Sequence, residues 1–113
     1  MPVIDKNTVI FNTGKPVDFE YPIAKIIEIE NVIVVILHIP PKREYNLNVF
    51  AFSLSGDFLW RIANTDLYYK NSDCPYVGYT LNENDQLVLF NWCDTAVVVD
   101  HNNGDILDKY VTK

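Results

Sequence analysis

The chain has 113 residues, of which 49% are hydrophobic and 21% are charged, as is usual for a single globular domain spanning residues 1–113. Its 15 acidic residues outnumber 9 basic ones and give a net charge of −6. Nucleic acids and anionic membranes require clustered cations, so this charge argues against both partners. Two cysteines are too few for a disulfide scaffold or a thiolate zinc site.

The N-terminal residues do not resemble a signal peptide, because polar and acidic residues interrupt the apolar ones. The longest apolar stretch, 32–39, is much shorter than the roughly 20 residues that span a bilayer. We therefore expect a cytoplasmic protein in which Cys74 and Cys93 are reduced, although their pairing is left open by the sequence.

An alternation of period two predicts strands along most of the chain, and no segment has a convincing helical period. The fully apolar stretch 32–39 is rich in β-branched residues and should form the central strand, which Pro40 and Pro41 end. A short helical turn is expected only at 65–69. In chain order, the expected strands cover 8–11, 17–19, 25–30, 32–39, 48–54, 58–62, 76–81, 87–92, 95–100 and 105–110.

Tight turns join most of these strands, which predicts an all-β, antiparallel meander of about ten short strands. So many strands must curl or split into two layers, as a sandwich, a barrel-like wrap or a partial propeller. Trp92 is expected to anchor the core. The other expected core residues are Ile27, Ile29, Val34, Ile36, Phe50, Phe52, Trp60, Leu89 and Val98.

An internal repeat relates residues 50–59 to residues 98–107, with Gly56 and Gly104 in equivalent hairpin turns. Repeats with a period of about 40–50 residues are typical of propeller blades. The first copy resembles the tryptophan-docking repeats of quinoprotein-type propellers through Ala51, Gly56 and the spacing to Trp60. The second copy departs from that pattern, and the chain is too short for the four blades that a closed propeller needs.

A second resemblance covers about a third of the chain and implies a fold more than an activity. Small bacterial proteins of unknown function are similar to this chain at Asn48–Ala51, Gly56, Leu59–Ile62, Asn91-Trp92 and Asn103–Leu107.

No group of residues predicts catalysis, a metal site or a cofactor site. His38 and His101 are expected to be structural, and no nucleophile elbow accompanies either cysteine. The stretch 100–105 offers oxygen ligands for calcium, but Gly104 and its neighbours fit a hairpin turn better than a calcium loop. We therefore expect a protein that is not an enzyme and that has no cofactor.

The most distinctive feature is a long irregular segment that combines tyrosines with acidic residues. Long loops often carry function, and tyrosine suits protein interfaces because it offers a large contact area at a low entropic cost. The alternative is that these tyrosines only cover the open ends of the sheet. The predicted contact residues are Asp66, Tyr68, Tyr69, Asp73, Tyr76 and Tyr79.

The sequence thus predicts a bacterial interaction module that binds a basic protein partner through an acidic, tyrosine-rich loop face. An immunity-type role, in which the chain neutralises a basic toxin, fits its size and acidity. The alternative is a small-molecule or glycan binder that uses Trp60, Trp92 or the tyrosines for stacking. Open sheet edges also predict a homodimer through edge strands.

Overall fold

The computed structural model describes residues 2–65 and 74–112, and it confirms the predicted all-β, antiparallel fold. Within these residues there is no helix that could span a membrane. Most of the helical turn predicted at 65–69 lies outside the described residues. Sheet A contains β1 (Val3–Asp5), β2 (Thr8–Ile10) and β3 (Pro16–Asp18). Sheet B contains β4 (Ile23–Ile29), β5 (Val32–Leu37), β6 (Val49–Ser53) and β7 (Phe58–Arg61). Sheet C contains β8 (Tyr76–Leu81), β9 (Leu87–Asn91), β10 (Thr95–Val99) and β11 (Ile106–Val111).

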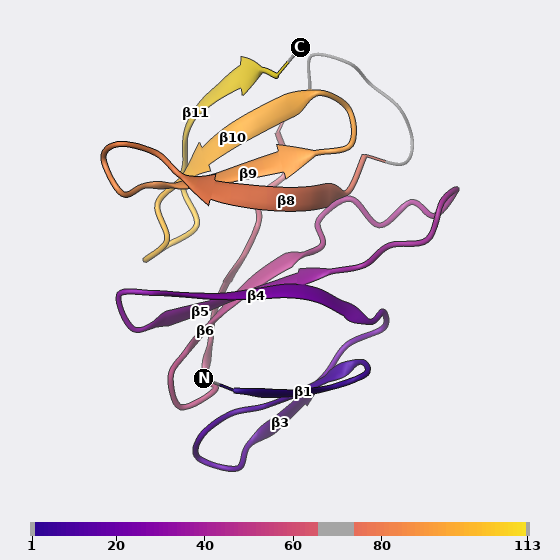
Figure 1. Ribbon diagram of the computed structural model, residues 1–113, viewed down its shortest axis with the longest axis vertical. Coiled ribbons are helices and arrows are strands. Elements are labelled where there is room, and N and C mark those ends of the chain that lie inside the picture. The colour runs from indigo at the N-terminus through magenta and orange to yellow at the C-terminus, as the bar shows by residue number, and fades with distance from the viewer. Residues whose placement is uncertain (1, 66–73, 113) are drawn as a thin grey trace.

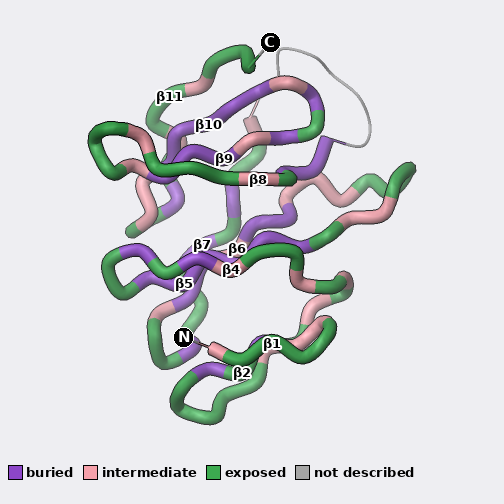
Figure 2. The backbone as a smooth tube through the Cα atoms, in the orientation of Figure 1, coloured by how far each residue is buried: buried purple, intermediate pink, exposed green. Residues whose placement is uncertain are grey.

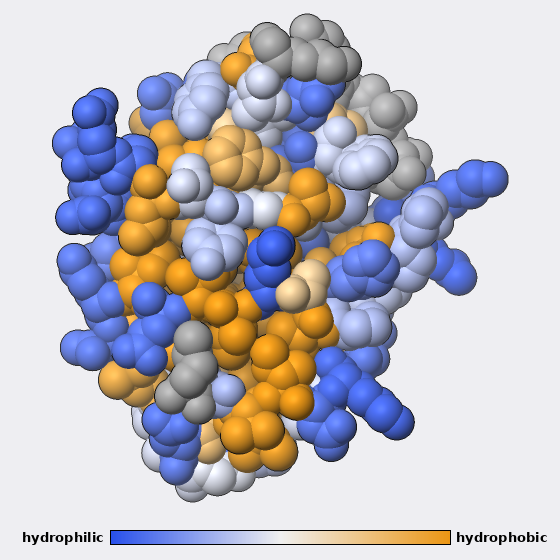
Figure 3. All heavy atoms as spheres, viewed as in Figure 1, coloured by the Kyte–Doolittle hydropathy of each residue, from blue (hydrophilic) through white to orange (hydrophobic). Residues whose placement is uncertain are grey.

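The three sheets are stacked in chain order, with sheet B in the middle (Figure 1). The molecule measures 40 × 34 × 18 Å, and its short dimension is close to the width of a four-stranded sheet. The two broad faces are therefore built from sheet edges. The edge strands β1, β4 and β8 lie on the face turned toward the viewer, which we call the front face (Figure 1). Hydrophobic residues gather through the middle of this face (Figure 3).

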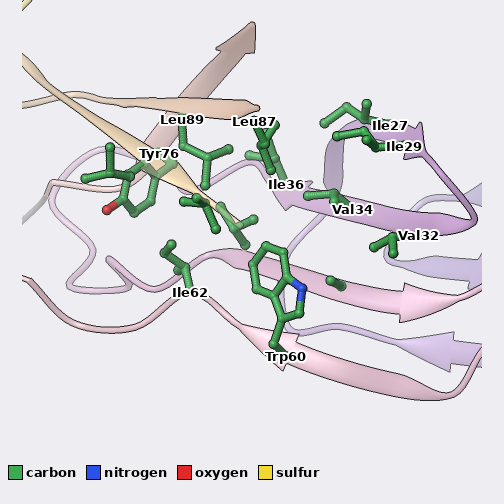
Figure 4. Close-up of a cluster of buried hydrophobic side chains, with 14 residues drawn as sticks. Ile27, Ile29, Val32, Val34, Ile36, Trp60, Ile62, Tyr76, Leu87 and Leu89 are labelled. Carbon is green, nitrogen blue, oxygen red and sulfur yellow. The ribbon is translucent and has the colours of Figure 1, made fainter. Parts of the chain in front are cut away.

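Two cores fill the spaces between the three layers, whereas the sequence predicted two layers around one core. Between sheets B and C, Leu87 and Leu89 point toward Ile36 and Ile62 (Figure 4). A separate cluster between sheets A and B contains Val9, Phe11, Ile33, Val35, Leu37 and Phe52. All six residues of β5 are buried because sheet B is covered on both faces, and Figure 2 shows the contrast with the exposed β1.

Three of the residues predicted for a single core therefore lie elsewhere. Phe50 and Phe52 pack between sheets A and B, and Val98 lies with Val88 and Ala96 in a third cluster. Because side chains alternate along a strand, that third cluster lies on the outer face of sheet C, opposite Val97.

The last hairpin of every sheet has a glycine of positive φ in its turn, and the turn of sheet C is one residue longer than the other two. A Cβ atom at Gly104 would lie 2.8 Å from the ring of Trp60 in sheet B, and one at Gly56 would lie 2.9 Å from the ring of Phe11, which follows β2 of sheet A. An aromatic side chain of one layer thus covers the hairpin glycine of the next. At Gly14, in the first sheet, a Cβ atom would meet nothing within 4 Å.

Candidate functional site

A cavity of about 260 Å³ opens between sheets B and C, at the end of the interface opposite to Trp60. We call it the Trp92 cavity, after the most exposed tryptophan of the chain. Its walls are mainly apolar, which suits the desolvation of an apolar group. The lining residues are Ala24, Leu37, His38, Ile39, Pro40, Pro41, Pro75, Tyr76, Val77 and Trp92.

Two β-bulges shape the mouth of the Trp92 cavity. The registers of β4 with β5 and of β8 with β9 each shift by one residue, which leaves Ala24 and Val77 without partners in the ladders. Bulges bend a strand and redirect its side chains, and they are frequent beside functional sites. Here both extra residues line the cavity, so the two irregularities contribute directly to its walls.

The side chain of Asn48, which is fully buried, joins Leu37 and Tyr76, two lining residues of the Trp92 cavity. Its Nδ2 donates to the carbonyl of Leu37 at 2.9 Å and to that of Tyr76 at 2.8 Å, and its Oδ1 accepts from the Tyr76 amide at 2.8 Å. Two residues earlier, Asn46 accepts from the amide of Cys74 at 2.7 Å. These two side chains dock the start of β8 onto sheet B, much as a neighbouring strand would.

Trp92 projects away from the protein, and the prediction that it anchors the core is wrong. It is 69% exposed, whereas Trp60 is 5% exposed. Its neighbours Asn91 and Cys93 are both buried, so the alternation of side chains turns Trp92 outward. Its backbone N–H donates to the carbonyl of Pro75 at 2.9 Å, which fixes its position at the cavity wall.

Cys74 and Cys93 form a disulfide, so the expectation of reduced cysteines is wrong. The pairing of Tyr76 with Asn91 sets the register at this end of β8 and β9. Two residues further out, the same register places Cys74 opposite Cys93, with 5.4 Å between their Cα atoms. The bulge at Val77 is responsible for this register, and its effect could not be read from the sequence.

Two of the six predicted contact residues can be placed in the structure. Tyr76 is 3% exposed and forms part of the inner wall of the Trp92 cavity. Burial raises the pKa of its hydroxyl to about 12. Tyr79 is 40% exposed on the front strand β8. Outside the described residues lie Asp66, Tyr68, Tyr69 and Asp73.

The two histidines occupy different positions. His38 follows β5, is exposed rather than buried in the central strand, and lines the Trp92 cavity. Its amide donates to the carbonyl of Pro22 at 2.8 Å. His101 lies in the last hairpin, where its Nε2 is 3.4 Å from the Glu30 carboxylate without hydrogen-bond geometry. In residues 2–65 and 74–112, no group of three potential ligands is placed to hold a metal ion.

The structure thus defines a small all-β protein of three stacked antiparallel sheets with an apolar cavity at one end of a layer interface. The family model described as Domain of unknown function (DUF7957) matches residues 3–111, and the chain therefore belongs to that family. No curated protein and no solved structure matches the chain.

Proposed function

We propose that this chain is a non-enzymatic module that binds a protein partner, and that its contact surface is centred on the Trp92 cavity. The observation that carries this proposal is an indole, 69% exposed, at the rim of a preformed apolar cavity. Exposed tryptophans beside pockets are frequent among the residues that dominate binding energy at protein interfaces.

The size and chemistry of the cavity favour one apolar side chain of a partner over a glycan. Its volume of about 260 Å³ lies just below the range of about 300–1,000 Å³ that is usual for small-molecule sites. Only His38, Tyr76 and Trp92 among its lining residues carry polar side-chain atoms, which are few for the hydroxyl groups of a sugar. A leucine or an aromatic residue of a partner would bury its surface there without leaving polar groups unpaired.

The lining chemistry also favours binding over catalysis. None of the described lining residues is Ser, Thr, Cys, Asp or Glu, so His38 has no nucleophile beside it to activate. Both cysteines are joined in the disulfide and offer no thiolate. Pro75 and Tyr76, which come directly after the predicted loop segment in the sequence, line the cavity. A basic partner, as an immunity-type role would require, would be attracted by the net charge of −6.

Panning a random-peptide phage library on the purified protein tests this proposal. The wild type should enrich peptides that share one large apolar residue, and Trp92→Ala should weaken their binding by at least about tenfold. Tyr110→Ala is the matched control, because Tyr110 is also exposed, at 43%, but lies on β11 outside the cavity. Equal binding by Trp92→Ala would exclude the cavity as the site. Binding to an oligosaccharide panel, with no peptide enriched, would favour the glycan alternative.

A further inference from the structure

Among the described residues, sheet A has three strands, one fewer than sheets B and C. Sheets B and C each have four strands, and in all three sheets the last two form the hairpin with the glycine turn. Counting back from that hairpin, β1 of sheet A corresponds to β5 and β9, which are second strands. The position in front of β1, which β4 and β8 occupy in their sheets, is therefore vacant within the described chain.

The edge of β1 also differs from all the other sheet edges. Each edge strand of sheets B and C, namely β4, β7, β8 and β11, contains a bulge. Such bulges discourage the pairing of an edge with another chain. In sheet A, β3 begins with Pro16, which cannot donate to a further strand. By contrast, β1 pairs with β2 in a regular register and contains no proline.

The free edge of β1 presents the backbone of Ile4. Backbone hydrogen bonds run from the Phe11 amide to the Lys15 carbonyl and from the Phe19 amide to the Asn7 carbonyl. Because hydrogen-bonded residues alternate along an antiparallel strand, the N–H and C=O of Val9 also point toward β3. Ile4 lies opposite Val9 in a pair without hydrogen bonds, so its N–H and C=O point to the free edge. Its side chain, 43% exposed, lies on the same side as the buried Val9 and so faces sheet B.

In sheet B, β4 is incompletely covered on the side that faces the vacant position beside β1. On the side of β4 that faces sheet C, Ile27 and Ile29 are 7% and 6% exposed. On the side that faces sheet A, Ile26 is half-buried and Glu28 is exposed. The carbonyl of Lys6 accepts from the amide of Ile23 at 3.2 Å, which limits the free edge to a short stretch around Ile4.

We propose that this vacancy binds a short extended segment of a protein partner, in which apolar residues alternate with Lys or Arg. The segment pairs with Ile4 as the missing first strand of sheet A and buries its apolar side chains against Ile4 and Ile26. Its cations point to the opposite face of sheet A, which is the face of the exposed Asp5. A second copy of this chain is a weaker candidate, because each copy carries a net charge of −6. This site is independent of the Trp92 cavity.

Amide exchange at Ile4, followed by NMR, tests the proposal with two synthetic peptides of about eight residues. One alternates Ile with Lys and the other alternates Ile with Glu. We expect the Lys peptide to slow exchange of the Ile4 amide at least about tenfold, and the Glu peptide to have little effect. Trp92→Ala should leave this protection unchanged, so a failure here is distinguishable from a failure of the cavity.

Ile4→Pro removes the free N–H without removing a bond to β2, and it should weaken binding of the Lys peptide at least about tenfold. Ile4→Val retains the N–H and should bind normally. If Ile4→Pro does not fold, Asp5→Lys provides the second test, because it should reverse the preference between the two peptides. Unchanged exchange at Ile4 with both peptides would overturn the proposal. Protection that appears without peptide, together with a concentration-dependent dimer, would overturn it in favour of a second copy.

Discussion

The two ends of the interface between sheets B and C are built in opposite ways. At one end Trp60 lies over Gly104, and its Nε1 donates to the carbonyl of His101 at 2.8 Å, so the layers are closed together. At the other end the layers separate around the Trp92 cavity, and Trp92 itself points into solvent. One end therefore stabilises the stack of sheets, and the other leaves an apolar surface available for binding.

The difference arises from how each end joins the layers. The closed end depends on a side chain that fills the space above a glycine with a φ of 82°. The open end depends on buried hydrogen bonds from Asn48 and on the disulfide, which hold β8 in place without filling the space between the layers. Substitutions at the open end should therefore separate the contacts that hold β8 in place from the side chains that are available for binding.

The largest effect is expected at the open end, from Asn48→Ala. Three buried hydrogen bonds would be lost and their backbone partners left unpaired, which should lower the free energy of unfolding by about 4 kcal/mol. Asn46→Ala removes one partly buried bond and serves as the control, with an expected loss of about 1 kcal/mol. Urea denaturation measures both values. Equal losses would mean that Asn48 does not hold the layers together.

Gly104→Ala tests the closed end. A side chain there must adopt a positive φ and collide with Trp60, and we expect a loss of about 3 kcal/mol. Gly14→Ala is a matched control, because Gly14 has a similar φ of 88° with open space around it, so only about 1 kcal/mol should be lost. A thermal or urea unfolding comparison separates backbone strain from the steric contact. Similar losses would show that Trp60 moves aside readily.

Removing the disulfide should loosen only the open end. The two cysteines are 19 residues apart, and a cross-link over such a loop contributes about 3 kcal/mol. The double variant Cys74→Ala, Cys93→Ala should lose this amount, and the wild type in excess dithiothreitol should match it. Hydrogen exchange should speed up at the start of β8 while the amides around Gly104 keep their protection. A wild type that unfolds at the same urea concentration with and without reductant would contradict the structural role of this bond.

The closed end was largely readable from the sequence and the open end was not. Alternating apolar residues and the glycine turns are local signals, and they placed the strands, the Gly56 and Gly104 hairpins and the buried Trp60. The third layer was missed because nothing local shows that Phe52 and Ile27 face different sheets. Composition also suggested that Trp92 would be buried. Its exposure depends instead on how the residues just after β9 pair with those just before β8.

The Trp92 cavity depends on contacts between distant parts of the chain. A single-residue bulge at Val77 determines which residues face each other across β8 and β9, and no residue type marks a bulge reliably. One local signal was available. Two asparagines at positions 46 and 48 lie on one side of an extended segment, and their side chains can form hydrogen bonds with the backbone of another strand. Bulges in the edge strands of sheets B and C discourage pairing with another chain. For the predicted edge-strand dimer, β1 is therefore the best-suited edge.

Ionisation of Tyr76 offers a smaller test of the open end. Burial raises the pKa of its hydroxyl from 10.0 to about 12, so the folded state keeps its proton after the unfolded chain has lost it. The resulting stability is fully present below pH 10 and is lost as the pH rises toward 12, by about 2 kcal/mol. Tyr76→Phe should show a flatter decline over this range in urea denaturation at a series of pH values. Parallel curves would mean that the hydroxyl reaches water in the folded protein.

The smallest effect on stability is expected from Trp92→Ala, which sharpens the contrast between the two tryptophans. An indole that is 69% exposed contributes little to the folded state, so the free energy of unfolding should change by less than about 0.5 kcal/mol. Trp60→Ala, at the closed end, should cost about 4 kcal/mol because it leaves a void above Gly104. Urea denaturation of both variants, beside peptide binding by Trp92→Ala, would show whether Trp60 serves folding and Trp92 serves recognition. A large loss of stability in Trp92→Ala would assign that side chain to the fold and not to a binding surface.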